Sequence, residues 1–222
     1  MRILCIGQIE DRTNIDKQIL KQTVHPDRVI LLEDKEPAIG VNARRIRIAE
    51  NHQKLIDIVK AYPEYDVIWQ VEGDCIFKPD TLQLLIERYK QLLYPKLGYV
   101  SGVQVGRHGI YALGAWHFPS QEEFSSLDCN ETRTTPVDAT GFYCLLAPRE
   151  AWLKGEATWN GERWGPDVNW GLSLKKQGYE IYADTNITVG HKTQRGEIWP
   201  EHISTCNVRF YKENGQWKYK TT

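Results

Sequence analysis

The sequence has no apolar run longer than a strand, no excess of charge of either sign and no paired spacing of cysteines. Its apolar stretches are shorter than the roughly 20 residues that a helix needs to cross a bilayer, so no transmembrane segment is expected. The net charge of −1 gives no general attraction to polyanions, and we expect no nucleic-acid partner. The five cysteines are scattered and never spaced as in a zinc knuckle.

No secretory signal is expected from the first residues of the sequence. Met1 and Arg2 lead directly into Ile3–Ile6, which is too short for a signal and is typical of a first strand. Cysteines in or beside expected strands behave as small hydrophobic residues, and this favours a reducing compartment. We therefore expect the protein to be cytoplasmic.

The composition is that of a globular protein. With 41% hydrophobic and 26% charged residues, the chain is not of the disordered class. Its 222 residues suit one α/β domain with a substantial core. Because no internal repeat and no linker is visible, we predict a single domain over 1–222.

The first hundred residues alternate between strand and helix signals. Strands are expected where β-branched and aliphatic residues form short runs, over 2–7, 28–32 and 65–71. Helices are expected over 14–22, over 43–62, and between Pro79 and Tyr94, with a loop over 37–41. This alternation predicts an α/β fold with a mostly parallel sheet and helices on both faces.

The second half of the chain gives weaker signals. Residues 99–116 are punctuated by glycine, and residues 117–137 and the tail from Lys192 show no clear period. The expected elements there are strands over 137–147 and 179–189, and helices over 149–153 and 166–177, the second closed by Gly178 in a left-handed conformation.

The turn Glu72-Gly73-Asp74 follows a buried strand abruptly. Gly73 allows a tight turn and a close approach of a ligand. Two neighbouring carboxylates repel each other unless a cation lies beside them, and oxygen ligands favour Mg²⁺ or Mn²⁺ over zinc. The alternative is a polar turn in which Asp74 helps to start the next helix, and the residues alone leave the two interpretations even.

His191 lies at the end of another expected strand. A single histidine is usually structural, but imidazole also binds metals, and pairing with Asp74 would favour Mn²⁺. This interpretation requires that the two strand ends meet in space.

Two further carboxylates stand at element ends. Asp34 ends the second strand, where ligands of parallel sheets bind, although these residues alone favour a solvated turn. Asp167, after Trp164-Gly165-Pro166, fits ordinary helix-start chemistry and equally a general base that is ionised at neutral pH. Trp164 would offer a flat face to a sugar ring.

In their order and spacing, these residues resemble a family 2-type glycosyltransferase with the GT-A fold. Similar segments cover most of residues 15–191. They are Ile15–Asp34, Asn42–Arg45, Asp66–Asp74, Thr140–Glu150 and Trp164–His191.

The resemblance implies a metal-dependent enzyme that moves a sugar from a nucleotide-diphosphate donor to a hydroxyl of a glycan, lipid-linked or protein acceptor. The nucleotide-binding half would span about 1–100 and the acceptor half about 101–222. The implied nucleotide-sugar contacts are Asp34, Arg44, Glu72 and Gly73, and the implied ligands of Mn²⁺ or Mg²⁺ are Asp74, His191 and Glu72. Asp167 would be the general base of an inverting transfer, and Trp164, Gly165 and Asp138 would lie near the acceptor.

Three departures from the family pattern leave alternatives open. Gly7-Gln8-Ile9-Glu10 replaces the family's Pro-x-Tyr-Asn, Glu72 replaces an aspartate, and Pro166 replaces an acid. A nucleotidyltransferase is one alternative, although the segment after the first strand is not the usual glycine-rich, basic loop. A non-catalytic GT-A-like sugar-binding module is the other, and the proline departure keeps it open.

Overall fold

The computed structural model describes residues 1–9, 12–34, 40–92, 96–106, 112–120, 122–128, 130, 133–159, 161, 164–193, 196–203 and 208–221. The helices are α1 (Arg12–Leu20), α2 (Val41–Ala61), α3 (Thr81–Gln91), α4 (Arg149–Lys154), α5 (Pro166–Lys176) and the 3₁₀ turn η1 (Pro200–His202). The strands are β1 (Ile3–Ile9), β2 (Arg28–Glu33), β3 (Val67–Glu72), β4 (Cys75–Ile76), β5 (Leu97–Gln104), β6 (Ala115–Ser120), β7 (Glu123–Ser126), β8 (Thr134–Val137), β9 (Ala139–Thr140), β10 (Cys144–Pro148), β11 (Glu180–Thr193), β12 (Gly196–Ile198), β13 (Val208–Glu213) and β14 (Gln216–Thr221).

A large sheet forms the centre of the molecule, with its strands in the order β12-β11-β5-β10-β3-β1-β2. β1 runs parallel to both β2 and β3, and β5 runs parallel to β11. β10 is antiparallel to both of its neighbours, and β4, β8 and β12 pair antiparallel with β11. The long strands of the sheet therefore run mostly in one direction, as predicted.

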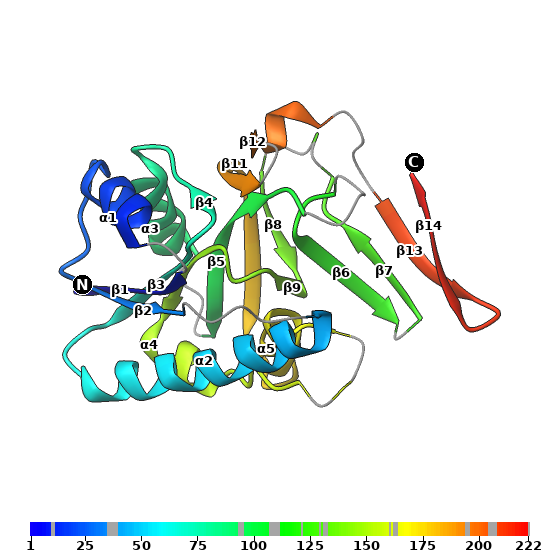
Figure 1. Ribbon diagram of the computed structural model, residues 1–222, viewed down its shortest axis with the longest axis horizontal. Helices are drawn as coiled ribbons and strands as arrows, with labels where there is room; N and C mark the ends of the chain where they lie inside the picture. Colours follow the sequence, from blue (N-terminus) through cyan, green and yellow to red (C-terminus); the bar gives the residue numbers. More distant parts are fainter. Residues whose placement is uncertain are drawn as a thin grey trace.

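Helices cover both faces of this sheet, which confirms the predicted fold class. α1 and α3 lie on one side, and α2, α4 and α5 on the other (Figure 1). Successive residues of a strand point to opposite faces, so Leu4 packs in the core with Trp152 and Trp170, whereas Cys5 packs in the core under α1 and α3. A central strand must be apolar on both faces to sit between two helix layers.

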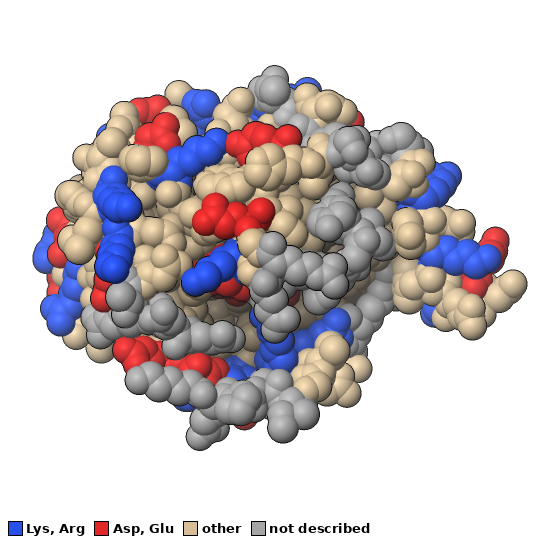
Figure 2. All heavy atoms as spheres, turned by 45° about the horizontal axis from the view of Figure 1, so that its top comes forward, with Lys and Arg blue, Asp and Glu red and all other residues tan. Residues whose placement is uncertain are grey.

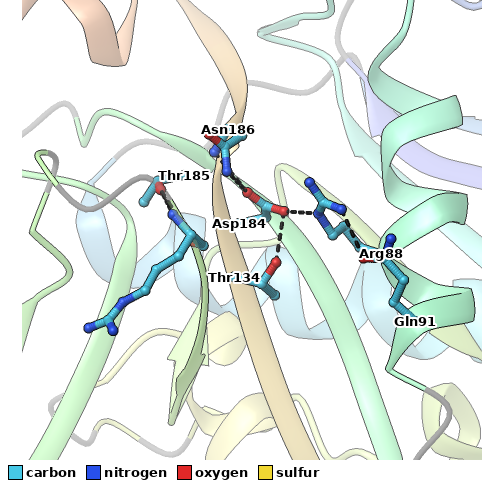
Figure 3. Close-up of polar contacts among 7 residues, drawn as sticks. Arg88, Gln91, Thr134, Asp184, Thr185 and Asn186 are labelled. Atoms are coloured by element: carbon cyan, nitrogen blue, oxygen red, sulfur yellow. Dashed lines mark hydrogen bonds and ion pairs between the residues drawn. The ribbon is translucent and has the colours of Figure 1, made fainter.

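The buried residue Asp184 of β11 accepts hydrogen bonds from residues of α3 and β8 (Figure 3). The side chain of Asp184 is fully buried at an irregularity in the pairing of β11 with β5. Its carboxylate accepts hydrogen bonds from the Thr134 hydroxyl at 2.9 Å, from the Asn186 backbone N–H at 2.8 Å and from the Arg88 guanidinium. Arg88 also donates to Gln91 at 2.8 Å. Three elements thus share one charged hydrogen-bond network.

We expect Asp184→Asn to lower the free energy of unfolding at neutral pH by about 2–3 kcal/mol, because Arg88 then faces a neutral amide in a partly buried site. Burial raises the pKa of Asp184, but the hydrogen bonds from Arg88, Asn186 and Thr134 outweigh it and hold the pKa below the usual value. The stabilisation is present above the unfolded-state pKa of about 3.9 and is lost as the pH falls through the folded-state value.

Urea unfolding of both proteins measures this difference. Glu213→Gln is the control, since Glu213 pairs with Lys218 while half-exposed, and exposed pairs contribute little. Equal losses in the two variants would contradict the assigned role of Asp184.

The structure has strands that the sequence patterns did not predict, and it divides one strand that they did. β6, β7 and β8 lie largely within residues 117–137, and β12, β13 and β14 follow Lys192; most of them belong to a second sheet of order β14-β13-β7-β6-β9, whose described pairings are antiparallel. The strand expected over 137–147 is broken, and Gly141–Tyr143 separates β9 from β10. Most of these strands have six residues or fewer, which is too short for a clear period.

Other expectations fall partly outside the described residues. Of the expected loop over 37–41, residues 37–39 are not described, and α2 begins at Val41. No helix in the described part of the chain combines the length and the apolar character that crossing a membrane requires. The assignment of 1–222 to one domain with two halves stays a prediction.

Candidate active site

The pairing of β4 with β11 brings the acidic turn to His191. Cys75 lies opposite His191 and Ile76 opposite Gly190, and the Lys192 N–H donates to the Asp74 carbonyl oxygen at 2.8 Å. The two segments that the sequence argument required to meet are thus neighbours. Their role as metal ligands stays a prediction.

Backbone contacts orient the His191 ring toward Asp74. Nδ1 of His191 lies 2.8 Å from the carbonyl oxygen of Val105, which can only accept, so Nδ1 carries a hydrogen. Nε2 then faces Oδ2 of Asp74 at 3.5 Å. In the neutral imidazole, Nε2 then carries a lone pair. Nε2 is therefore the atom through which His191 would bind a metal.

The chemistry of the neighbouring groups selects among possible ligands. Ligand atoms of Glu72, Asp74 and Cys75 lie within 4.8 Å of one another. The Cys75 thiol donates to the Tyr143 carbonyl at 3.1 Å and is buried, so it acts as a wall of the site rather than as a thiolate ligand.

Two carboxylates and one imidazole remain as possible ligands. Neighbouring ligands of one octahedral ion at about 2.1 Å lie about 3 Å apart, close to the 3.5 Å between Asp74 and His191. Asp74 and His191 therefore have the spacing of two ligands of one Mn²⁺ or Mg²⁺ ion, and the imidazole favours Mn²⁺. The binding of the same ion by Glu72 stays a prediction.

Gln8 links the ends of three parallel strands. It lies opposite both Leu32 and Glu72 in register, and its carbonyl oxygen accepts the Gly73 N–H at 3.1 Å. Its side-chain amide is 3.4 Å from Oδ2 of Asp34. Asp34, Gln8 and Glu72 consequently lie side by side along the carboxyl edge of the sheet.

Asp34 is held by α2 as well as by Gln8. Oδ2 accepts from the Asn51 amide at 2.9 Å, and Oδ1 lies 3.3 Å from the Arg47 guanidinium. These contacts fix the carboxylate, which has room for further donors because it offers about four lone-pair sites. Sequence reasoning missed Arg47 and Asn51, although their spacing of four residues places them on one helix face.

Asp167 folds back over the start of α5. A Cβ placed on Gly165 would lie 2.4 Å from Oδ1 of Asp167, and one placed on Gly141 would lie 3.6 Å from Oδ2. Burial raises the pKa of Asp167 above its usual value, while hydrogen bonds from the Val168 N–H and its own N–H, and the charges of two arginines, lower it. The net result is a base stronger than an exposed aspartate.

The two arginines beside Asp167 are Arg45 and Arg44, near the start of α2. Arg45 has the larger effect on the Asp167 pKa, and its guanidinium lies 5.9 Å from the centre of the Trp159 ring. Arg44, which the resemblance singles out, is exposed. Arg45 is therefore a further candidate for contact with a charged donor.

A three-residue segment connects the candidate base with the acidic turn. Gly141 at one end lies against the Asp167 carboxylate. At the other end, the Tyr143 carbonyl accepts the Glu72 N–H at 3.3 Å and the Cys75 thiol. Asp167 and the possible metal ligands thus border the same segment.

Trp164 and Asp138 join the second sheet to the region of α5. The Trp164 ring meets Phe118 and Phe124 edge-on, each with centroids 4.8 Å apart. The Asp138 carboxylate accepts the Phe118 N–H at 2.7 Å and lies 4.0 Å from the Lys175 amine. Both residues have structural contacts, and their part in acceptor binding, like that of Gly165, stays a prediction.

Charge is mixed on the face that Figure 2 shows. Lys and Arg side chains are interspersed with Asp and Glu side chains over its described part, without one continuous basic patch. Attraction of a diphosphate to this face would come from particular residues rather than from a broad positive field.

No family model matches the chain, and no curated protein matches it. Among solved structures, the crystal structure of A197 from STIV matches with a TM-score of 0.55 and 14% identity, over 91% of this chain and 92% of that chain. This similarity supports the α/β fold alone.

Two more distant structures also match. A glycosyltransferase involved in the glycosylation of the major capsid of PBCV-1 has a TM-score of 0.37 and 9% identity, over 68% of this chain and 62% of that chain. CMP:2-keto-3-deoxy-manno-octonic acid synthetase complexed with CTP has a TM-score of 0.46 and 8% identity, over 82% and 89%. At these scores we draw no conclusion about this chain from either one.

Proposed function

We propose that the protein is a metal-dependent glycosyltransferase of the GT-A type, which moves a sugar from a nucleotide-diphosphate donor to a hydroxyl acceptor. The observation that carries the proposal is the approach of Asp74 to His191 at 3.5 Å, beside the Glu72 carboxylate, which lies within 4.8 Å of Asp74. Ligands of open α/β sheets bind outside the carboxyl ends of the strands. Gln8, Asp34 and Glu72 lie at this edge, at the ends of β1, β2 and β3.

Different residues along the sheet edge would bind the nucleotide and the metal ion. Asp34, held by Asn51 and Gln8, would accept hydrogen bonds from the ribose or base. Glu72, Asp74 and His191 would hold Mn²⁺ or Mg²⁺, and such an ion supplies positive charge to a departing diphosphate.

Asp167 would act on the acceptor. Its carboxylate would take the proton of the acceptor hydroxyl while that oxygen bonds to the anomeric carbon and the bond to the diphosphate oxygen breaks. One direct displacement inverts the anomeric centre. The acceptor would be a glycan, lipid-linked or protein hydroxyl, and the cytoplasmic location stays a prediction.

A thermal-shift screen of nucleoside diphosphates tests the donor and metal site together. With Mn²⁺ and a diphosphate at about 100 times its Kd, we expect stabilisation by about 2.7 kcal/mol, which is about 5–10 °C for a chain of this size. Asp74→Asn should remove the Mn²⁺-dependent part of the shift, because an amide is a weaker ligand than a carboxylate. The control is Asp57→Asn, which changes an exposed carboxylate on α2.

The products distinguish the competing functions. A glycosyltransferase should release nucleoside diphosphate from a nucleotide sugar with Mn²⁺ present. Release of pyrophosphate from a nucleoside triphosphate would instead indicate a nucleotidyltransferase. Binding without release of either product would leave only a sugar-binding module. Retention of anomeric configuration in the product would contradict the role given to Asp167.

A further inference from the structure

One face of the second sheet carries a row of aromatic side chains. Directly paired residues of neighbouring strands project to the same face of a sheet, and so do alternate residues of one strand. Phe210 of β13 lies opposite both Phe124 of β7 and Tyr219 of β14. Trp217 precedes Tyr219 by two residues. These four rings therefore share one face.

Two further rings extend the row toward α5. Phe118 of β6 stacks on Phe124 with the ring centroids 5.6 Å apart, and Trp164 meets both of these rings edge-on. Phe124 in turn stacks on Phe210 at 4.3 Å. We call these six side chains the aromatic face: Phe118, Phe124, Trp164, Phe210, Trp217 and Tyr219.

The aromatic face ends beside the candidate base. Trp164 directly precedes Gly165, and a Cβ placed on Gly165 would lie 2.4 Å from Oδ1 of Asp167. On its other side, the Trp164 ring lies 6.3 Å from the Trp217 ring, between centroids. A ligand that lies along the aromatic face would thus have one end near the carboxylate of Asp167.

The outer part of the aromatic face is open to solvent. Tyr219 is 56% exposed and Trp217 is 37% exposed, whereas the other four rings are half-buried. Both exposed rings belong to the β13–β14 hairpin, which lies at the right-hand edge of the molecule, beyond β7 and away from the central sheet (Figure 1). The rings are held on a paired sheet and can contact a ligand without a rearrangement of the backbone.

The opposite face of the same strands is charged. There Arg209 pairs with Glu123, and Lys218 pairs with Glu213. An antiparallel sheet with one charged and one apolar face normally has the apolar face covered. The exposure of the two outer rings therefore points to a partner of that face.

The area of the aromatic face suits a small ligand better than a protein. With about 250 Å² for a whole aromatic side chain, the six rings at their exposures offer at most about 600 Å². A stable protein interface buries about 800 Å² on each partner. A row of rigid rings also suits sugar rings, because their C–H groups, which carry partial positive charge, pack on the negative faces of aromatic rings.

We propose that the aromatic face binds an oligosaccharide chain and that the acceptor is the end of such a chain. The placement of that end at Asp167 rests on the proposed function, whereas the binding of the chain does not. The row crosses β6, β7, β13 and β14, which is about 14 Å at the spacing of neighbouring strands. A chain of several sugar units would therefore contact more rings than a single sugar does.

Calorimetric titration of oligosaccharides tests this inference. Cellohexaose, chitohexaose, maltohexaose and glucose are each titrated up to about 10 mM, a range that detects Kd values near 1 mM. We expect saturable binding of at least one hexasaccharide and no detectable binding of glucose.

Variants of alternate residues on β14 locate the binding. Trp217→Ala/Tyr219→Ala removes both exposed rings and should weaken hexasaccharide binding by about tenfold or more. The matched control is Lys218→Ala/Lys220→Ala, which changes the opposite face of the same strand and should leave the affinity unchanged. Trp217→Phe/Tyr219→Phe keeps both rings and should keep most of the affinity. Urea unfolding confirms that each variant folds, and Tyr219→Ala alone, at the most exposed ring, is the milder form of the test.

Three results would overturn the inference. They are no saturable binding of any hexasaccharide, equal weakening by the two alanine pairs, and unchanged binding in Trp217→Ala/Tyr219→Ala. A dimer that this variant dissociates, seen by size-exclusion chromatography, would instead assign the aromatic face to contact between two copies of the chain.

The thermal shift with Mn²⁺ and a nucleoside diphosphate distinguishes the two proposals. A normal shift without oligosaccharide binding would contradict this inference alone and leave the donor site in place. Oligosaccharide binding without any shift would contradict the glycosyltransferase and leave the aromatic face as a sugar-binding surface.

Discussion

Asp167→Asn should lower the rate of sugar transfer by about 10²–10⁴-fold while the nucleoside diphosphate and Mn²⁺ still bind. The amide has nearly the shape of the carboxylate and can keep its place over Gly165, but it cannot accept a proton. The rate is measured as transfer to the acceptor, and donor binding is measured separately by thermal shift.

The pH dependence of transfer gives an independent check on Asp167. Burial raises the pKa of this carboxyl, so activity should fall on the acid side at a pH above the ordinary aspartate value of about 3.9. The base is active only when ionised, and the rate therefore decreases as the pH falls through that pKa. Arg45→Gln removes a charge that lowers the pKa and should move the acid limb to higher pH.

Two further variants test whether the loss of rate is specific to the Asp167 carboxylate. Gly165→Ala would place a methyl group 2.4 Å from the present position of Oδ1 and should displace the carboxylate, with a partial loss of rate. Asp138→Asn changes another carboxylate of the same region and should leave most of the rate. A large loss of rate with Asp138→Asn and none with Asp167→Asn would indicate that Asp138, and not Asp167, is the general base.

His52→Phe should remove a steep pH dependence of stability. In the folded protein the pKa of His52 is lowered from 6.5 to about 3 by burial. Between these values the unfolded chain binds a proton that the folded protein does not, so stability falls as the pH falls. One pKa unit corresponds to about 1.4 kcal/mol, which gives a loss of about 3 kcal/mol from pH 6.5 to 4 in the natural protein.

The variant should lose that slope without losing the fold. A phenyl ring can keep the stacking on Phe142 and removes two buried nitrogens that lack partners, so His52→Phe should be no less stable than the natural protein at pH 7. His25→Gln, at an exposed position, is the control and should keep the natural slope. The pH dependence of the free energy of unfolding is measured from denaturant midpoints at several pH values. Identical slopes in His52→Phe and the natural protein would show that folding does not change the pKa of His52.

The sequence by itself determined the parallel part of the sheet and its helices. β1, β2 and β3 arise from short apolar runs that are readable locally, and helix ends such as Gly178, with a φ of 80°, follow from local chemistry. The order of strand and helix signals then fixes the α/β class, because parallel strands need helical connections between them. Asp34, Glu72 and Asp74 could be placed at strand ends from the sequence, because each follows one of these short apolar runs.

Only the tertiary structure decided which distant residues meet. The pairing of β4 with β11 brings Asp74 to His191, and the Val105 carbonyl orients the imidazole. The second sheet, with Phe124 stacked on Phe210 at 4.3 Å, joins segments that show no period of their own. Such contacts depend on packing between parts far apart in the chain, and local propensity carries no information about them.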